Sequence, residues 1–230
     1  MKRICTICAR GGSKGLPNKN VKLLLGKPLL VHSIERAQES GLFDRIAVSS
    51  DSPQILSLAR DAGVTDLVER PADMATDFAP KAPAIRHALT VVEARWNEVY
   101  ETQVDLAVTS PLRRSDDIRG AVSLLETLGV SSVITGKPSD HSPYFSLVEE
   151  QPDGHVELSK KADFVRRQDC PRSFDMDGSI YVWNTSVFRA DPKVFYSDTR
   201  LFEMPPERSR DIDTELDFAI VEMLMIRQQR

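Results

Sequence analysis

Residues 3–20 read RICTICARGGSKGLPNKN, an apolar run that changes abruptly into a loop of glycines, cations and asparagines. The run at 3–9 is typical of a buried strand, and a helix-like pattern follows the loop at 27–40. Doubly wound α/β folds bind phosphate groups in this position, between the first strand and the helix after it. Glycine there lets backbone N–H groups turn toward an anion. The stretch therefore predicts an anion-binding loop at the end of the first strand.

Two common phosphate-binding motifs do not match this loop. A Walker A motif starting at Gly11 needs glycine at its sixth position, which is Leu16, and a G-x-G-x-x-G pattern is also missing. P-loop kinases and dinucleotide oxidoreductases therefore fit poorly. Composition alone would also allow a solvated basic loop without a ligand.

The rest of the chain alternates between strand-like and helix-like segments. Strands are expected at 45–51, 66–70, 104–111, 131–138, 174–188 and 199–205, and helices at 27–40, 52–63, 81–96, 115–129 and 214–230. Helical patterns of this length between strands indicate βαβ units. We therefore expect an α/β fold with a doubly wound, mostly parallel sheet, formed as a single domain over residues 1–230.

Residues 139–173 break this alternation. The segment is polar, carries a Pro-Asp-Gly turn and contains two short alternating stretches at 144–149 and 155–160. This pattern predicts a protruding β-hairpin arm. Its apolar residues have little core of their own and need a partner surface, so we expect a homodimer with the arm as its dimerisation insertion.

Composition excludes several classes of protein. The 230 residues carry a net charge of -4, which gives no support to nonspecific nucleic-acid binding. No apolar run reaches the length of a membrane helix, and the N-terminal apolar stretch is too short for a signal peptide. The three cysteines are too few for a disulfide framework and fit a reducing cytoplasm. Cys5 and Cys8 lie on a strand and should face opposite sides, as strand residues rather than a redox pair.

Six stretches together resemble the CMP-sialic acid synthetases, also called acylneuraminate cytidylyltransferases. They are ARGGSKGLPNKN (9–20), ERPADMATD (69–77), TSPLR (109–113), SPYFSLVE (142–149), RRQDCPRSFDMDGSIYVWN (166–184) and DIDTELDF (211–218). The resemblance implies a Rossmann-like nucleotidyltransferase fold. It also implies a reaction in which the anomeric hydroxyl of an acidic nine-carbon keto sugar attacks the α-phosphate of CTP. The products are the CMP-sugar and pyrophosphate, with Mg²⁺ (or Mn²⁺) as cofactor.

The resemblance also implies which residues bind the nucleotide. Arg10 and Lys14 are expected to hold the triphosphate, and Lys19 to stabilise its β- and γ-phosphates, since positive charge must face the departing pyrophosphate. Asn20 is expected to contact the ribose or position the loop, and Arg70 to lie near the cytidine. The expected nucleotide-binding set is Ala9, Arg10, Gly11, Gly12, Ser13, Lys14, Asn20 and Arg70, and the catalytic set is Arg10, Lys14, Lys19 and Asp213.

Two acids in the DIDTE segment are the expected metal ligands. Asp211 and Asp213 are two residues apart, which places both carboxylates on one side of an extended segment. Hard oxygen ligands of this kind suit Mg²⁺ that bridges to phosphates. Without the resemblance, the same acids could serve as caps of the helix that follows. No general base is assigned.

For the acid sugar, Arg167 is the expected partner of the carboxylate, because a guanidinium binds a carboxylate through two hydrogen bonds. Gln168 lies beside it, Lys137 is a second candidate, and Tyr181 is expected either to line the sugar pocket or to pack in the strand core. A solvated pair of arginines at 166–167 is the alternative.

Some positions depart from the family pattern and bear on the substrate. A Gln-Pro pair that many sialic acid enzymes carry is Ala107–Val108 here, which disfavours N-acetylneuraminate itself. Lys81 and Pro83 are closer to the CMP-legionaminic acid synthetase branch. CMP-3-deoxy-octulosonate or CMP-pseudaminate synthetase, or a non-catalytic nucleotide-binding relative, are the alternatives.

Overall fold

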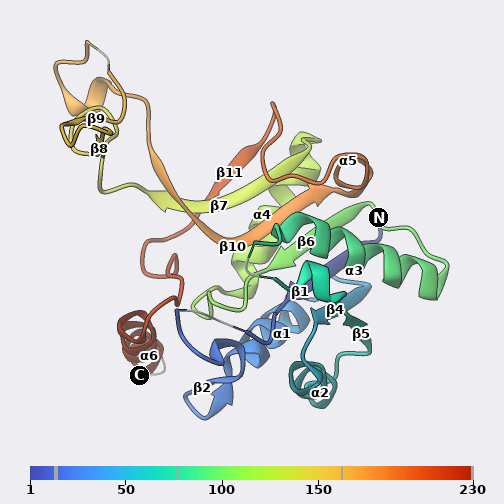
Figure 1. The fold of residues 1–230 in the computed structure, drawn as a ribbon. Coiled ribbons are helices and arrows are strands. Elements are labelled where there is room, and N and C mark those ends of the chain that lie inside the picture. Colours follow the sequence, from blue (N-terminus) through green and yellow to red (C-terminus); the bar gives the residue numbers. More distant parts are fainter. Residues whose placement is uncertain (13–14, 77, 162, 229–230) are drawn as a thin grey trace.

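A computed structural model describes residues 1–12, 15–76, 78–161 and 163–228. A seven-stranded sheet crosses the molecule in the order β11-β7-β10-β6-β1-β4-β5 (Figure 1). β10 pairs antiparallel with β6 and β7, and the other neighbouring strands of the sheet pair parallel. The expected doubly wound, mostly parallel sheet is therefore confirmed. Its strands are β1 (Arg3–Cys8), β4 (Arg45–Ser50), β5 (Asp66–Glu69), β6 (Thr102–Leu106), β7 (Ser132–Pro138), β10 (Phe174–Asn184) and β11 (Arg200–Glu203).

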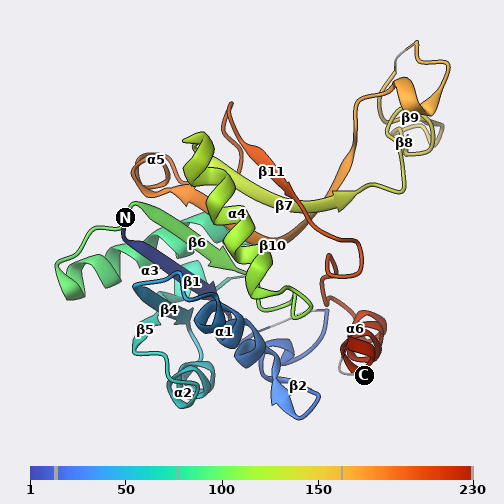
Figure 2. The same ribbon diagram turned by 180° about the vertical axis from the view of Figure 1, so that it is seen from behind.

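Helices cover both faces of the sheet. α3 (Lys81–Trp96) and α5 (Thr185–Ala190) lie on the face seen in Figure 1, and α1 (Leu29–Ser40) and α4 (Ser115–Leu128) lie on the face seen in Figure 2. α2 (Pro53–Asp61) packs against α1, and α6 (Glu215–Gln228) adds Phe218 and Val221 to the core on that side. Each face thus has its own hydrophobic core, as apolar residues on both sides of a parallel sheet require. No helix among the described residues is both long and apolar enough to cross a membrane.

Short elements complete the chain. Leu23–Leu24 (β2) and Lys27–Pro28 (β3) pair as a small ribbon before α1, and three 3₁₀ turns cover Lys19–Val21, Ala72–Met74 and Arg167–Asp169. Cys5 packs in the core on the α1 side and Cys8 packs toward α3, so the two thiols face opposite sides of β1 as expected.

Two predicted strands are too long at their carboxyl ends. The strand expected at 174–188 ends at Asn184, whose side chain accepts a hydrogen bond from the backbone N–H of Ser186 at 3.0 Å and starts α5. This is a helix cap that overrides the apolar pattern. The strand expected at 104–111 ends at Leu106, and residues 107–112 form a loop whose Ala107 carbonyl accepts a hydrogen bond from the Arg113 guanidinium at 3.2 Å.

The segment 139–173 projects from the sheet (Figure 1). It leaves the end of β7 and returns into β10, and the Ser139 N–H donates to the Ser173 carbonyl at 2.9 Å across its base. β8 (Val148–Glu150) and β9 (Val156–Leu158) pair antiparallel within it. Phe145, Leu147, Val148, Val156 and Leu158 are exposed on this arm.

Candidate active site

A cavity of 410 Å³ opens at the carboxyl ends of the central strands. The loop after β1 contributes Arg10, Lys19 and Asn20, the end of β5 contributes Arg70, and the start of α3 contributes Lys81. Asp213, from the segment that precedes α6, also lines the cavity. This is where an open α/β sheet binds its ligands.

Backbone contacts hold the loop after β1 in place. The Asn20 amide donates to the Arg10 carbonyl at 2.8 Å, and the Gly11 N–H donates to Asp51 Oδ1 at 2.9 Å. Of the two roles expected for Asn20, the structure therefore shows the positioning of the loop. The predicted contacts of Ser13 and Lys14 lie outside the described residues. Gly15 is packed so tightly that a Cβ atom there would meet the Asp213 carbonyl oxygen at 2.6 Å.

The side chains of three cavity cations are anchored by oxygen atoms. Lys19 Nζ contacts Asp213 Oδ1 at 2.8 Å and the Ile212 carbonyl at 2.7 Å. Arg70 donates to the Ser49 carbonyl at 2.9 Å, and Arg10 to the Thr76 carbonyl at 3.3 Å. Their positive charges face one cavity, which suits a polyanionic ligand such as a triphosphate.

The two acids expected to bind metal lie close enough to interact. Burial raises the pKa of the Asp211 carboxyl, and the negative charge of Asp213 raises it further. Hydrogen bonding from Thr109, with the charges of Lys19 and Lys81, acts in the opposite direction but does not cancel the rise. The two carboxylates therefore lie within range of each other's charge, and their binding of a metal stays a prediction.

Two hydrogen bonds hold the acidic segment, residues 209–213, which carries Asp211 and Asp213. The Ile212 N–H donates to the Thr109 carbonyl at 2.9 Å, and the Ser209 hydroxyl donates to Asp177 Oδ2 at 2.7 Å. Asp177 lies on β10, so the strand that runs into the arm also positions the acids.

Lys81 and Asp105 form an ion pair on the wall of the cavity. Lys81 Nζ lies 2.6 Å from Asp105 Oδ2, and the Thr6 hydroxyl donates to Asp105 Oδ1 at 3.0 Å. Asp105 is completely buried on β6, directly opposite Tyr181 of β10. Burial and the Asp105 carboxylate raise the pKa of the neighbouring Cys8 thiol to about 12, so this thiol is not a nucleophile at neutral pH.

Residues 4–223 match the sequence model of the family described as cytidylyltransferase. The chain belongs to the cytidylyltransferase family.

Individual relatives of this cytidylyltransferase support the same family assignment. It is 40% identical to a CMP-N,N'-diacetyllegionaminic acid synthase of Campylobacter jejuni over 222 residues, 96% of this chain and 94% of the relative. It is 35% identical to an N-acylneuraminate cytidylyltransferase of Streptococcus agalactiae, over 95% of this chain and 52% of that protein. A solved CMP:2-keto-3-deoxy-manno-octonic acid synthetase complexed with CTP has the same fold, with a TM-score of 0.72 at 17% identity and coverage of 99% and 100%.

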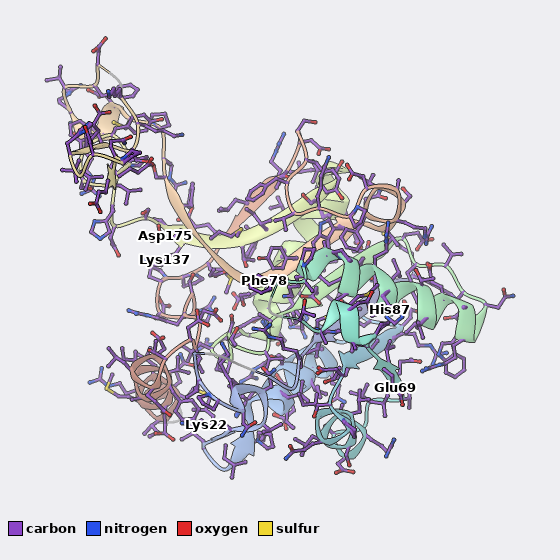
Figure 3. All side chains as sticks on the ribbon, viewed as in Figure 1. Lys22, Glu69, Phe78, His87, Lys137 and Asp175 are labelled. Atoms are coloured by element: carbon purple, nitrogen blue, oxygen red, sulfur yellow. The ribbon has the colours of Figure 1, made fainter. Side chains whose placement is uncertain are left out.

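The residues predicted to bind the sugar do not all reach the cavity of this cytidylyltransferase. Tyr181 lies beside it, with its ring centroid 5.2 Å from Lys81 Nζ. Lys137 pairs with Asp140 and Asp175 at 3.2 and 3.3 Å, at the root of the arm (Figure 3). Arg167 donates to the Asp140 carbonyl at 2.7 Å and, with Gln168, lines a separate cavity of 230 Å³ at the base of the arm. Within one chain these three residues are apart from the nucleotide cavity, and their role stays a prediction.

Sequence reasoning missed three residues of the site. Lys81 was noted only as a marker of one branch, Asp177 was not considered as a residue that positions the acids, and Asp105 was not considered at all. A signal for Asp105 exists, because an acid within the apolar strand VDLAV has to be paired if the strand is buried. Asp177 has no such signal, because its partner Ser209 is remote in sequence.

Proposed function

We propose that this cytidylyltransferase activates a nonulosonic acid, N,N'-diacetyllegionaminic acid or a close analogue, as its CMP derivative. The anomeric hydroxyl of the sugar attacks the α-phosphorus of CTP. The bond from that phosphorus to the bridging oxygen breaks, pyrophosphate leaves, and the hydroxyl proton is released. The observation that carries the proposal is the 40% identity to the legionaminic acid enzyme over nearly the full length of both chains.

The loop after β1 binds the triphosphate in this reaction. Arg10 and Lys19 neutralise the phosphate chain. Arg70, which lines the same cavity, is expected to contact the nucleoside. Since nucleotidyl transfer needs alignment and charge stabilisation more than covalent help from the protein, these residues supply most of what the chemistry requires.

Asp211 and Asp213 are the residues that would hold Mg²⁺. Two carboxylates are the donors this ion uses when substrate phosphates provide the remaining ligands. The pKa of Asp211 is raised by burial and, to a lesser extent, by the charge of Asp213, and a bound cation would favour the charged form of the carboxyl against both. When bound, Mg²⁺ would polarise the phosphate oxygens and offset the charge that develops on them. Lys19, already on Asp213, would move toward the phosphates or remain as the partner of that carboxylate.

We also propose that the protein is a cytoplasmic homodimer. Its three cysteines are free thiols, as a reducing compartment favours. The exposed apolar side chains of the arm are a surface that a second copy would bury. Arg167 and Gln168 would then be available to a site of the dimer rather than to that of their own chain.

The test is pyrophosphate release from CTP with Mg²⁺ and a panel of acid sugars. The panel contains N,N'-diacetyllegionaminate, N-acetylneuraminate, pseudaminate and 3-deoxy-octulosonate, and ATP, GTP and UTP replace CTP in control reactions. We expect the highest kcat/KM with CTP and the legionaminate.

Preference for another acid sugar would move the assignment to that substrate. Binding of CTP without release of pyrophosphate for any sugar would instead indicate a non-catalytic nucleotide-binding protein.

A further inference from the structure

Lys81 is the first residue of α3 and lines the nucleotide cavity together with residues of the loop after β1. Its side chain is 42% exposed, whereas the Asp105 side chain is fully buried. The ammonium is therefore paired with a carboxylate that solvent does not reach, while the lysine side chain itself is partly exposed and lines the cavity. The start of a 16-residue helix adds its partial positive charge at the same point.

Burying the Asp105 carboxylate costs desolvation free energy, and packing of the sheet does not require an acid at this position. An acid in the middle of the sheet must be paired, and an apolar residue would avoid the desolvation of both charges. Burial by itself lowers the pKa of Lys81, but the Asp105 carboxylate outweighs burial and the pKa is raised, so the lysine is charged throughout the neutral range. The pair thus keeps one positive charge fixed at one place on the cavity wall.

Lys81 lies among residues that are expected to contact different parts of the two substrates. Lys81 lines the cavity shared with Arg70 and Lys19, its Nζ lies 5.2 Å from the Tyr181 ring centroid, and its charge acts on Asp211. The α-phosphate of CTP has to lie between the nucleoside and the β- and γ-phosphates, and it must also face the incoming sugar. It is therefore the group of the nucleotide that has to approach the expected nucleoside contact Arg70, the expected β- and γ-phosphate contact Lys19 and the expected sugar contact Tyr181 at the same time.

We propose that Lys81 is a catalytic residue that binds the α-phosphate of CTP, the group being transferred, and that Asp105 is the positioning residue that holds it there. The inference rests on the proposed cytidylyltransferase function. It assigns the phosphates of CTP to two different parts of the cavity. The loop after β1 takes the β- and γ-phosphates, which leave. Lys81 takes the phosphate on which negative charge increases as the new bond forms, and this charge is where a fixed cation lowers the barrier.

The α-phosphate can be isolated by choice of ligand. CMP carries it alone, cytidine lacks it, and pyrophosphate represents the β- and γ-phosphates. Each is titrated by calorimetry against the full chain, its Lys81→Met variant and a matched Lys22→Met control. Lys22 (labelled in Figure 3) pairs with Glu215 at 2.7 Å and is not among the residues that line the cavity.

Lys81→Met should weaken CMP binding about tenfold or more and leave the affinities for cytidine and pyrophosphate unchanged, as expected for one charge-assisted hydrogen bond. Turnover of CTP should fall on the order of 10²-fold. Lys22→Met should bind all three ligands like the unmodified chain. Lys81→Arg should recover part of the CMP affinity, because it restores the charge with a different shape.

Asp105→Asn keeps the shape of the side chain and removes its charge. We expect kcat to fall with little change in the KM for CTP, since the lysine stays but is no longer fixed. The double variant should be no slower than Lys81→Met alone, because both changes remove the same contribution. If the pair had only a structural role, the substitutions would lower the melting temperature, and their effects on turnover would not show this non-additivity.

Unchanged CMP affinity in Lys81→Met would overturn the inference, and so would a loss confined to pyrophosphate. If the unmodified chain bound neither CTP nor CMP, the proposed function itself would fail. The two failures are therefore distinguishable. If Asp105→Asn does not fold, Lys81→Met with the three ligands still decides the question.

Discussion

Gly15 and Asp213 are 198 positions apart in sequence, yet a Cβ atom on Gly15 would lie 2.6 Å from the Asp213 carbonyl oxygen. The same acidic segment receives Lys19 Nζ on the Ile212 carbonyl. The nucleotide loop and the proposed metal-binding acids are therefore built against each other, and the glycine is the residue that allows their backbones to approach.

Gly15→Ala should separate the loop from the acids. The methyl group meets backbone rather than a flexible side chain, so the segments must shift, at a cost of about 1–3 kcal/mol in stability. We expect a lower melting temperature and a KM for CTP raised by about tenfold or more, since an ångström of misplacement is costly in catalysis. Gly12→Ala is the control for stability, because nothing lies within 4 Å of a Cβ atom there. Equal melting temperatures for the two variants would contradict the close approach.

Asp211→Asn and Asp213→Asn should each abolish most of the Mg²⁺-dependent activity, with turnover reduced on the order of 10²-fold or more. The reason is that an amide cannot replace the charge that holds the cation. CTP binding measured without metal should change little. The control is Glu222→Gln on α6, an acid outside the cavity that should leave turnover as it was. If Asp213→Asn kept full turnover at saturating Mg²⁺, the metal assignment would fail.

The raised pKa of Asp211 predicts an effect of pH on stability. A carboxyl whose pKa is raised on folding stabilises the protein in its protonated form, below the unfolded pKa of about 3.9. That contribution is lost as the pH rises through the folded pKa. Without metal or nucleotide, Asp211→Asn should therefore melt above the unmodified chain at pH 7, and the difference should shrink toward pH 4. Thermal unfolding across this range measures it, and a less stable variant at pH 7 would refute the prediction.

The arm should mediate self-association. Leu147→Asp and Val156→Asp each place a charge on an exposed apolar residue of the hairpin. If a second copy covers these residues, either change should convert the protein to a monomer in sedimentation experiments, since a charge buried in an interface is strongly unfavourable. Because both residues are exposed in the single chain, neither change should lower the melting temperature of the monomeric variant. An unmodified chain that sediments as a monomer would rule out the dimer.

Local patterns were enough to predict most of the sheet. The helix at 81–96 has the predicted bounds, and β7 begins one residue after the predicted start, because apolar periodicity and turn residues agree there. Prediction failed where a side-chain contact decided the structure. Asn184 starts α5 by capping it, and residues after Leu106 leave the sheet because a buried arginine binds their backbone. The Lys81–Asp105 pair and the contact of Asp177 with Ser209 join remote segments, which no local pattern reports.

That arginine, Arg113, provides the last prediction. It is completely buried and donates to the carbonyls of Ala107 and Ser179 and to the Ser33 hydroxyl, which ties α1, β10 and the loop after β6 together. Burial lowers its pKa to about 10, and these hydrogen bonds, together with the charges of Asp105, Asp177 and Asp117, offset the cost of burying the guanidinium. Arg113→Met should cost about 2–4 kcal/mol in the free energy of unfolding by urea, because buried carbonyls lose their donor. The exposed neighbour is the control, and Arg114→Met should change stability by less than about 0.5 kcal/mol. Equal stability of the two variants would mean that Arg113 does not hold the strand ends together.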